Sequence, residues 1–163
     1  MAGAPKQEFP PLLRPGFHQM SLVNVRQLCV DEFPLSSTRA PIMDGIENVI
    51  NVLMSSGVRG RIWVDGSFMT QKVNPEDVDI LLEISADNYD NGSYNVKRAA
   101  DWVGSNLKET HLCDSYLLVS YPPGHQFHPE GQFVLAYWMR QFGFSRSDQM
   151  KGIGVVNLPE GVQ

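Results

Sequence analysis

The sequence predicts an α+β fold in which a mixed β-sheet is backed by helices. Segments with the apolar spacing of helices and short segments rich in β-branched and aromatic residues follow one another in the order α-β-β-α-β-α-β. Of the 163 residues, 42% are hydrophobic and 19% are charged. This is the composition of a globular chain that buries a core, and the length suits one domain.

The N-terminal part of the chain divides into an arm and two helices. The first 20 residues are rich in proline and show no apolar period, so we expect an irregular arm over 1–20 and a single domain over 21–163. Ser21 is placed to cap a short helix, because a serine side chain accepts hydrogen bonds from the first N–H groups of a helix. Thr38 is expected to cap a longer helix in the same way, and Gly57 lies where that helix would end.

In the rest of the chain, segments with the apolar spacing of a helix and segments with the composition of a strand follow one another several times. In order, we expect a strand over 61–65, a strand over 77–84, a polar loop over 85–95, a helix over 96–107, a strand over 114–121, a helix centred on 133–138 and a strand over 152–158. No internal repeat or low-complexity run interrupts this order. The helices and strands are therefore expected to share one core.

Charge and composition exclude several classes of function. The 13 basic and 18 acidic residues give a formal charge of −5, whereas wrapping long nucleic acid needs a broad basic surface. No apolar stretch approaches the roughly 20 residues of a membrane span, and the N-terminus lacks the pattern of a signal peptide. The two cysteines, Cys29 and Cys113, are too few for a disulfide framework. We expect a cytoplasmic protein whose partners include no extended nucleic acid and no membrane.

The segment with the clearest chemistry reads VDGSFMTQKVNPEDVDIL and covers 64–81. A strand ends in Gly66-Ser67, nine residues follow, and Asp77 and Asp79 open the next strand. Alternate residues of a strand point to the same face, so the two carboxylates are expected to project together. Paired carboxylates repel each other unless a cation lies between them, and Mg²⁺ prefers such oxygen ligands together with phosphate oxygens.

Four further residues extend this site. Gly66 allows a close approach of the backbone to phosphate, and the Ser67 hydroxyl and neighbouring N–H groups can donate hydrogen bonds to it. Lys72 lies between this turn and the acidic pair, so it is a third candidate for nucleotide binding. Asp114 begins the next predicted strand and would complete a two-metal site, as a ligand or a base, if it reaches the same face.

Each candidate also has a structural interpretation. An Asp-x-Asp pair or a Gly-Ser turn is common by itself, Asp114 can cap a turn at a strand end, and Lys72 can be a solvated loop charge. For Asp65, the expected role is to hold the turn that follows it. The combination of strand, turn, spacing and acidic pair favours the functional interpretation over these.

Other side chains carry weaker signals. His125 and His128 could supply two zinc ligands, but no matching second pair is evident. Tyr137 and Trp138 are expected in the core rather than stacked on a base. A basic group near the C-terminus can bind phosphate or an acceptor, or it can complement the end of a helix, and its members are Arg140, Arg146 and Lys151.

The run from DGSF to EDVDILLEI resembles the signature of the DNA polymerase β-like nucleotidyltransferase superfamily, in which a Gly-Ser turn is followed some ten residues on by two acidic residues one position apart. It is most similar to short bacterial members, the minimal nucleotidyltransferases and their relatives. The clear match covers 61–84. The chain departs from the pattern just after the turn, where an arginine is common in the family and this sequence reads FMTQK.

The resemblance implies a fold, a reaction and cofactors. It implies a mixed sheet backed by helices, two Mg²⁺ ions (or Mn²⁺ in their place), and transfer of a nucleoside monophosphate from an NTP to a hydroxyl with release of pyrophosphate. By position, Gly66 and Ser67 would hold the β- and γ-phosphates, while the metal-binding and catalytic carboxylates would be Asp77, Asp79 and Asp114.

The resemblance also bears on substrates and partners. We expect AMP to be transferred from ATP to a hydroxyl of a protein or a small molecule. Some relatives of this size act in toxin–antitoxin pairs, so a partner protein and a role in defence are expectations of the same kind.

Two other hypotheses stay open. In the first, the fold is retained without the chemistry, and the chain is a nucleotide-sensing or partner-binding module that binds NTP without releasing pyrophosphate. In the second, the chain is an interaction domain, and the acidic pair only supplies polar side chains at the end of a strand. Replacing Asp77 and Asp79 with alanine would then change stability rather than affinity for a nucleotide.

Overall fold

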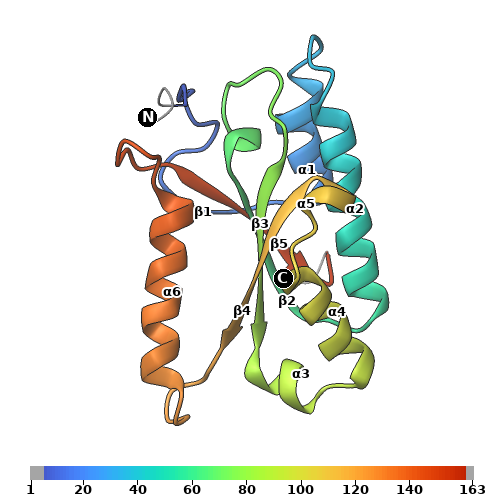
Figure 1. Ribbon diagram of the computed structural model, residues 1–163, viewed down its shortest axis with the longest axis vertical. Helices are drawn as coiled ribbons and strands as arrows, with labels where there is room; N and C mark the ends of the chain where they lie inside the picture. Colours follow the sequence, from blue (N-terminus) through green and yellow to red (C-terminus); the bar gives the residue numbers. More distant parts are fainter. Residues whose placement is uncertain (1–5, 161–163) are drawn as a thin grey trace.

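A computed structural model describes residues 6–160 and has one five-stranded β-sheet with helices on both faces (Figure 1). The elements in chain order are β1 (Gly16–Gln19), α1 (Leu22–Arg26), the π-helix η1 (Gln27–Asp31), α2 (Arg39–Ser55), β2 (Gly60–Asp65), the 3₁₀-helix η2 (Ser67–Met69), β3 (Val78–Ser85), α3 (Ala86–Asn91), α4 (Tyr94–Gly104), α5 (Lys108–His111), β4 (Cys113–Ser120), α6 (His128–Gly143) and β5 (Gly152–Leu158). The predicted α+β class with a mixed sheet is confirmed.

The sheet has the strand order β1-β5-β2-β3-β4. Its central strand, β2, runs antiparallel to both of its neighbours, β5 and β3. Each outer pair is parallel, with β1 beside β5 and β4 beside β3. The parallel pair β3 and β4 is connected by α3, α4 and α5, because a crossover between parallel strands needs a long connection. Because β4 is the last strand in this order, it is an edge strand of the sheet.

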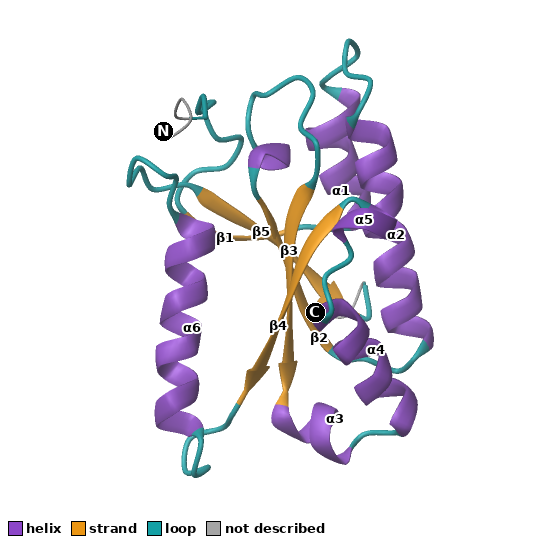
Figure 2. Cartoon of the chain, viewed as in Figure 1, coloured by secondary structure: helices purple, strands orange, loops and turns teal. Residues whose placement is uncertain are grey.

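Two clusters of buried side chains lie on opposite faces of this sheet. On β2, Ile62 and Val64 belong to the larger cluster, whereas Trp63 between them belongs to the smaller one, as the alternation of a strand requires. Helices α2 and α4 cover the larger cluster (Figure 2). Among the described helices, α6 covers the other face, through Phe142 and the partly buried Trp138.

The helices on the larger cluster show several of the predicted signals. The Ser21 side chain accepts a hydrogen bond from the Asn24 N–H, so it caps α1 as expected. Gly57, with a φ of +86°, follows the end of α2. In the part of the chain that the structure describes, every helix is too short or too polar to cross a membrane.

Two expectations about the N-terminal part are wrong. The arm does not extend to residue 20, because Gly16–Gln19 forms β1 and pairs with β5. This short, largely exposed edge strand buries no face, so its sequence lacks the alternation that marks a strand. Thr38 does not cap α2 with its side chain. Ser36 does so instead, since its hydroxyl accepts hydrogen bonds from the N–H groups of Thr38 and Arg39.

The polar segment 85–95 is not a loop throughout. It contains α3, which begins after Ser85, and the Ser85 side chain accepts a hydrogen bond from the Asn88 N–H. Ala86 is the buried residue of this helix. A six-residue helix with one buried residue shows no apolar period, so only its cap marks it in the sequence.

Candidate functional site

Strand register brings the predicted carboxylates to one end of the sheet. Asp79 on β3 lies directly opposite Asp65 on β2 and directly opposite Asp114 on β4. Asp77 immediately precedes β3, two residues from Asp79 and thus on the same side of the chain. Asp79 is therefore the centre of the group, with an acidic residue on each neighbouring strand.

The position of Asp79 disfavours its charged form. Burial, followed by the negative charges of Asp114 and Asp77, raises the pKa of Asp79 from 3.8 to about 6. The charges of Lys151 and Lys108 act in the opposite direction. Asp77 and Asp114 thus lie near enough to repel the Asp79 carboxylate, and for Asp77 the two-residue spacing predicted this.

The two flanking carboxylates already have polar partners. The Lys108 ammonium lies 3.2 Å from Asp77 Oδ2. Asp114 accepts hydrogen bonds from the Asn106 amide at 2.5 Å and from the Tyr116 hydroxyl at 3.1 Å. Among residues 6–160, no three His, Cys, Asp or Glu side chains form a group that could hold a metal ion as they stand.

The turn after β2 is shaped around Asp79. Gly66 has a φ of +83°, and a Cβ at this position would lie 2.8 Å from Asp79 Oδ2, so only glycine fits without displacement. The half-buried Ser67 begins η2, and its carbonyl oxygen accepts hydrogen bonds from the N–H and the hydroxyl of Thr70. The predicted Gly-Ser turn thus lies against the central carboxylate.

Asp65 holds this turn, as expected, and also connects it to β5. Its side chain is 1% exposed, and its Oδ1 accepts a hydrogen bond from the Gly66 N–H and lies 3.4 Å from the Lys151 ammonium. Burial raises the pKa of Asp65 to about 8, and the charge of Lys151 opposes this rise. Asp65 Oδ2 is buried without a hydrogen-bond partner among the described residues.

The cations nearest to the carboxylates are Lys108 and Lys151, rather than Lys72. The Lys72 ammonium lies 5.9 Å from the centre of the Phe9 ring, in the N-terminal arm. Lys151 comes from the predicted basic group, whose member Arg140 instead pairs with Asp148. No sequence signal marks Lys108, because its link to Asp77 depends on how the crossover packs.

A buried arginine, which the sequence analysis missed, fixes the loop between β2 and β3. Arg39 is fully buried, and its guanidinium stacks on Phe33 with 3.7 Å between the guanidinium carbon and the ring centre. It donates hydrogen bonds to four carbonyl oxygens, those of Cys29, Phe68, Thr70 and Lys72. Three of these carbonyls belong to the loop that carries the Gly-Ser turn, so Arg39 fixes the shape of that loop.

The histidines considered for zinc have other contacts. His128 Nδ1 lies 2.8 Å from the Tyr121 carbonyl oxygen, and the His125 ring packs against the rings of Tyr121 and Phe127. Trp138 packs on the smaller cluster as expected, whereas Tyr137 is 55% exposed and lies outside the core.

Comparison with protein-family models assigns the chain over nearly its whole length, since one model matches residues 6–157. The chain belongs to the DUF6932 family. DUF6932 is described as a family of unknown function. No curated protein and no solved structure matches the chain. For this member of DUF6932, the arrangement of its own residues is therefore the basis for a functional proposal.

Proposed function

We propose that this DUF6932 protein is a Mg²⁺-dependent nucleotidyltransferase that moves a nucleoside monophosphate from an NTP to a hydroxyl. The observation that carries the proposal is the register that sets Asp79 between Asp65 and Asp114, beside a turn at Gly66. Carboxylates converge on one side of this turn, and Ser67, whose hydroxyl and N–H suit phosphate, lies in it. The resemblance of 61–84 to the nucleotidyltransferase superfamily supports the same reaction.

The donor set suits Mg²⁺ in its chemistry. Asp77, Asp79 and Asp114 supply only carboxylate oxygens, which Mg²⁺ and Mn²⁺ prefer. A cation among them would relieve the repulsion that raises the pKa of Asp79. Binding requires Asp77 to leave Lys108 and Asp114 to leave its two hydrogen-bond donors. Two bound Mg²⁺ ions would lower the pKa of the acceptor hydroxyl and neutralise charge on the phosphates.

The residues of the chain have separate roles in the proposed transfer. The Gly66-Ser67 turn binds the β- and γ-phosphates with the N–H and the hydroxyl of Ser67. The acceptor oxygen forms a bond to the α-phosphorus, the bond from that phosphorus to the bridging oxygen breaks, and pyrophosphate leaves. Asp114 accepts the proton of the acceptor hydroxyl, and Asp65 keeps the turn in place through the Gly66 N–H.

The substrate and the setting follow from the resemblance. We propose ATP as the donor, a protein or small molecule as the acceptor, and a cytoplasmic role in a toxin–antitoxin or defence system. In such a system the acceptor or the antitoxin would be a partner protein. These finer assignments rest on the superfamily resemblance.

A transfer assay tests the reaction. Protein with Mg²⁺, α-phosphate-labelled ATP, GTP, CTP or UTP, and lysate from the source cell should transfer label to a macromolecule or a small product. Asp77→Asn with Asp79→Asn should abolish transfer, because loss of metal ligands costs several orders of magnitude in rate. The matched control, Asp87→Asn with Asp90→Asn, changes two exposed acids on α3 and should transfer normally. Equal transfer by both double variants would contradict the site.

A second candidate is a binding module of the same fold without catalysis. One observation favours it: Lys108 and Lys151 already neutralise part of the carboxylate group. Such a module would bind NTP, and neither labelled product nor pyrophosphate would appear in the same assay. Nucleotide binding without turnover in the wild type would support this candidate over the enzyme.

A further inference from the structure

The outer edge of β4 is eight residues long, carries a single charge and is covered by Leu107 at its beginning. β4 ends the sheet, so no strand among residues 6–160 pairs with its outer side. Its eight residues read CDSYLLVS, in which Asp114 is the sole charge and no proline or lysine interrupts the edge. Natural proteins usually protect such an edge with charges, proline or a covering segment, because its free backbone groups pair readily with another chain.

The groups that face outward along this edge can be assigned from one hydrogen bond. The Cys113 N–H donates to the Leu107 carbonyl oxygen, which belongs to the turn outside the sheet. Backbone groups of alternate residues point the same way in a strand, so Leu117 and Val119 also direct their N–H and C=O groups outward. Leu107 covers the beginning of the edge, and the edge is open farther along.

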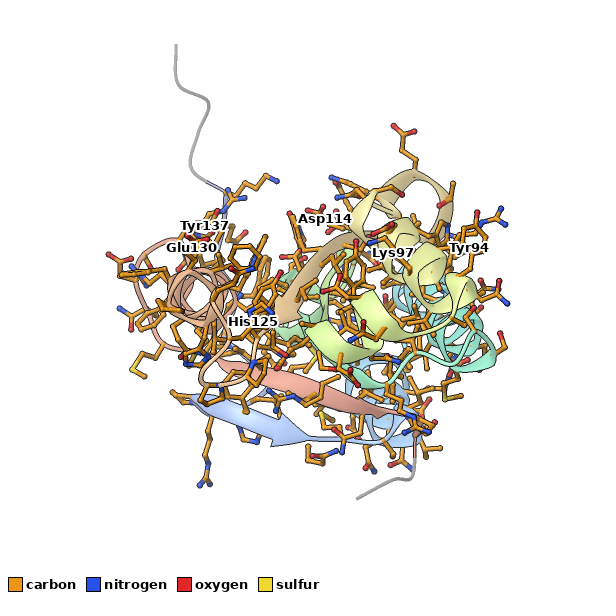
Figure 3. All side chains as sticks on the ribbon, turned by 90° about the horizontal axis from the view of Figure 1, so that it is seen from below. Tyr94, Lys97, Asp114, His125, Glu130 and Tyr137 are labelled. Atoms are coloured by element: carbon orange, nitrogen blue, oxygen red, sulfur yellow. The ribbon has the colours of Figure 1, made fainter. Side chains whose placement is uncertain are left out.

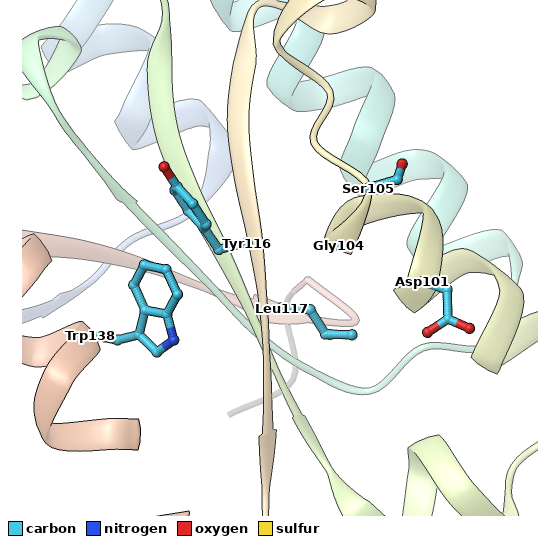
Figure 4. Close-up of a pocket in the computed structure, with 6 residues that line it drawn as sticks. All are labelled: Asp101, Gly104, Ser105, Tyr116, Leu117 and Trp138. Carbon is cyan, nitrogen blue, oxygen red and sulfur yellow. The ribbon is translucent and has the colours of Figure 1, made fainter. Parts of the chain in front are cut away.

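A hollow of about 470 Å³ lies over this open part of the edge (Figure 4). Tyr116 and Leu117 both line it, although adjacent residues of a strand point to opposite faces. The hollow therefore extends across the edge itself. Its walls are Trp138 from α6 on one side and, on the α4 side, Asp101, Gly104 and Ser105. We call this space the β4 groove.

The shape of the β4 groove favours a single extended segment. At its floor Leu117 directs its N–H and C=O outward, and another extended backbone satisfies such groups best. α4 and α6 stand on either side of the edge, and Figure 3 shows Asp114 and β4 between them. A second copy would bring its own α4 and α6 against these walls, whereas one strand from a partner protein fits between them.

The side chains of the groove indicate the chemistry of that segment. The Tyr116 and Trp138 rings pack with 4.6 Å between their centres, and the exposed Tyr137 ring lies 5.0 Å from Trp138. These rings suit an apolar or aromatic side chain. Asp101 on the opposite wall is exposed, and its Oδ1 accepts a hydrogen bond from the Tyr89 hydroxyl. The negative charge of this carboxylate complements a lysine or arginine of the segment.

We propose that the β4 groove binds an extended, basic and apolar peptide segment of a partner protein as a sixth strand of the sheet. The Tyr116 hydroxyl, at one end of the groove, donates to Asp114, so the bound segment runs beside the carboxylate group. If the proposed transferase function holds, this segment is the acceptor and carries the serine, threonine or tyrosine hydroxyl. That second part rests on the proposed function, and the docking itself does not.

Peptide selection tests the docking without nucleotide or metal. A displayed library of random ten-residue peptides is selected on the full chain, and the affinity of the best peptide is measured by fluorescence anisotropy. N-methylation of single peptide amides should weaken binding about fivefold to tenfold at every second position, because only alternate amides of a strand face β4. No selected peptide, or sensitivity without this alternation, would overturn the proposal.

Variants of the groove locate the binding. Ser105→Trp fills the groove from an exposed helix C-cap position and should weaken the peptide at least about tenfold. Ser56→Trp is the matched control, because Ser56 is the C-cap of α2 and does not line the groove. Like the Ser105 hydroxyl, the Ser56 hydroxyl donates a hydrogen bond to a carbonyl oxygen in the last turn of its own helix. Asp101→Lys should selectively weaken basic peptides. Equal binding by Ser105→Trp and Ser56→Trp, or a wild-type dimer that Ser105→Trp dissociates, would contradict the proposal.

The acceptor role has its own readout. With Mg²⁺ and α-labelled ATP, the wild type should label a hydroxyl residue of the bound peptide, and Ser105→Trp should not. If a peptide binds with the alternating pattern but takes no label, the docking site is supported and the role of the bound segment as acceptor is overturned. If label is transferred to another acceptor and no peptide binds in the groove, the transferase function is supported and the docking site is overturned.

Discussion

At Asp79, the position that suits the binding of a metal ion also disfavours the charged form of the carboxylate. The register that makes it the centre of the site also surrounds it with like charges and removes it from water. Its folded-state pKa of about 6 lies above the ordinary 3.8, so the folded protein binds a proton that the unfolded chain has released. This contribution to stability is present at low pH and is lost as the pH rises through about 6.

Asp79→Asn should remove this pH dependence. Between pH 5 and pH 8, without Mg²⁺, the free energy of unfolding of the wild type should fall by roughly 1 kcal/mol relative to that of the variant. Urea unfolding at the two pH values measures the difference. Adding Mg²⁺ at pH 8 should recover stability in the wild type only, because the cation binds the ionised carboxylates.

Asp90→Asn provides the control for that experiment, since Asp90 is exposed on α3. Its unfolding free energy should follow the wild type at both pH values. If the gap between wild type and Asp79→Asn is the same at pH 5 and pH 8, the electrostatic account of the site is incorrect.

Arg39 stabilises the loop between β2 and β3 from within the core. Arg39→Leu should lower the free energy of unfolding by about 3 kcal/mol or more, because four carbonyl oxygens lose their donor and at least one stays buried. Arg26→Leu is the control: Arg26 makes ion pairs with Asp44 and Glu47 at the surface, and its loss should cost under about 1 kcal/mol. Thermal and urea unfolding of both variants compare the two, and equal losses would contradict the role given to Arg39.

Among the elements, the turn between β2 and η2 connects the fold to the site most directly. Gly66→Ala places a side chain at a positive φ, which costs about 1–3 kcal/mol, and brings its Cβ against Asp79. We expect a lower melting temperature and weaker Mg²⁺–NTP binding, because the carboxylate must move.

Gly124→Ala separates these two effects. Gly124 has a φ of +90°, but a Cβ there has no atom within 4 Å, so this variant carries the backbone strain without the contact. It should lose stability and retain nucleotide affinity. If both alanine variants bind Mg²⁺–NTP equally, the close packing of Gly66 on Asp79 has no role in the site.

The sequence predicts elements well where a face is buried. β3 and β5 are apolar along most of their length, and α4 has one apolar face, so their periods are clear. β1 buries little, and its place in the sheet depends on pairing with β5, which no local pattern encodes. The cap of α2 shows a similar limit, because Ser36 and Thr38 are both suitable residues and only the backbone conformation selects one.

For the candidate site, the sequence predicts the contacts that follow from alternation and misses those made by distant segments. Asp77 and Asp79 share one side because they are two residues apart, and Gly66 is required by the turn. The ion pairs of Lys108 and Lys151 join segments that are far apart in the chain. Local sequence gives no information on which lysine reaches which carboxylate.

At the scale of the whole molecule, carboxylates and groove share one sheet. The carboxylates lie where β2 ends and where β3 and β4 begin, and the β4 groove follows the edge of the same sheet away from them. Tyr116 contacts Asp114 and lines the groove, so it joins the two. A donor held by the turn and an acceptor held by the groove would meet at Asp114.

The central claim is that the carboxylate group and the Gly-Ser turn bind Mg²⁺–NTP. Isothermal titration with an ATP analogue that cannot be cleaved between the α- and β-phosphates, with and without Mg²⁺, tests it most directly. We predict binding to the wild type that depends on Mg²⁺ and weakens at least about tenfold in Asp77→Asn with Asp79→Asn. Equal affinity in wild type and double variant, or in the presence and absence of Mg²⁺, would contradict the claim.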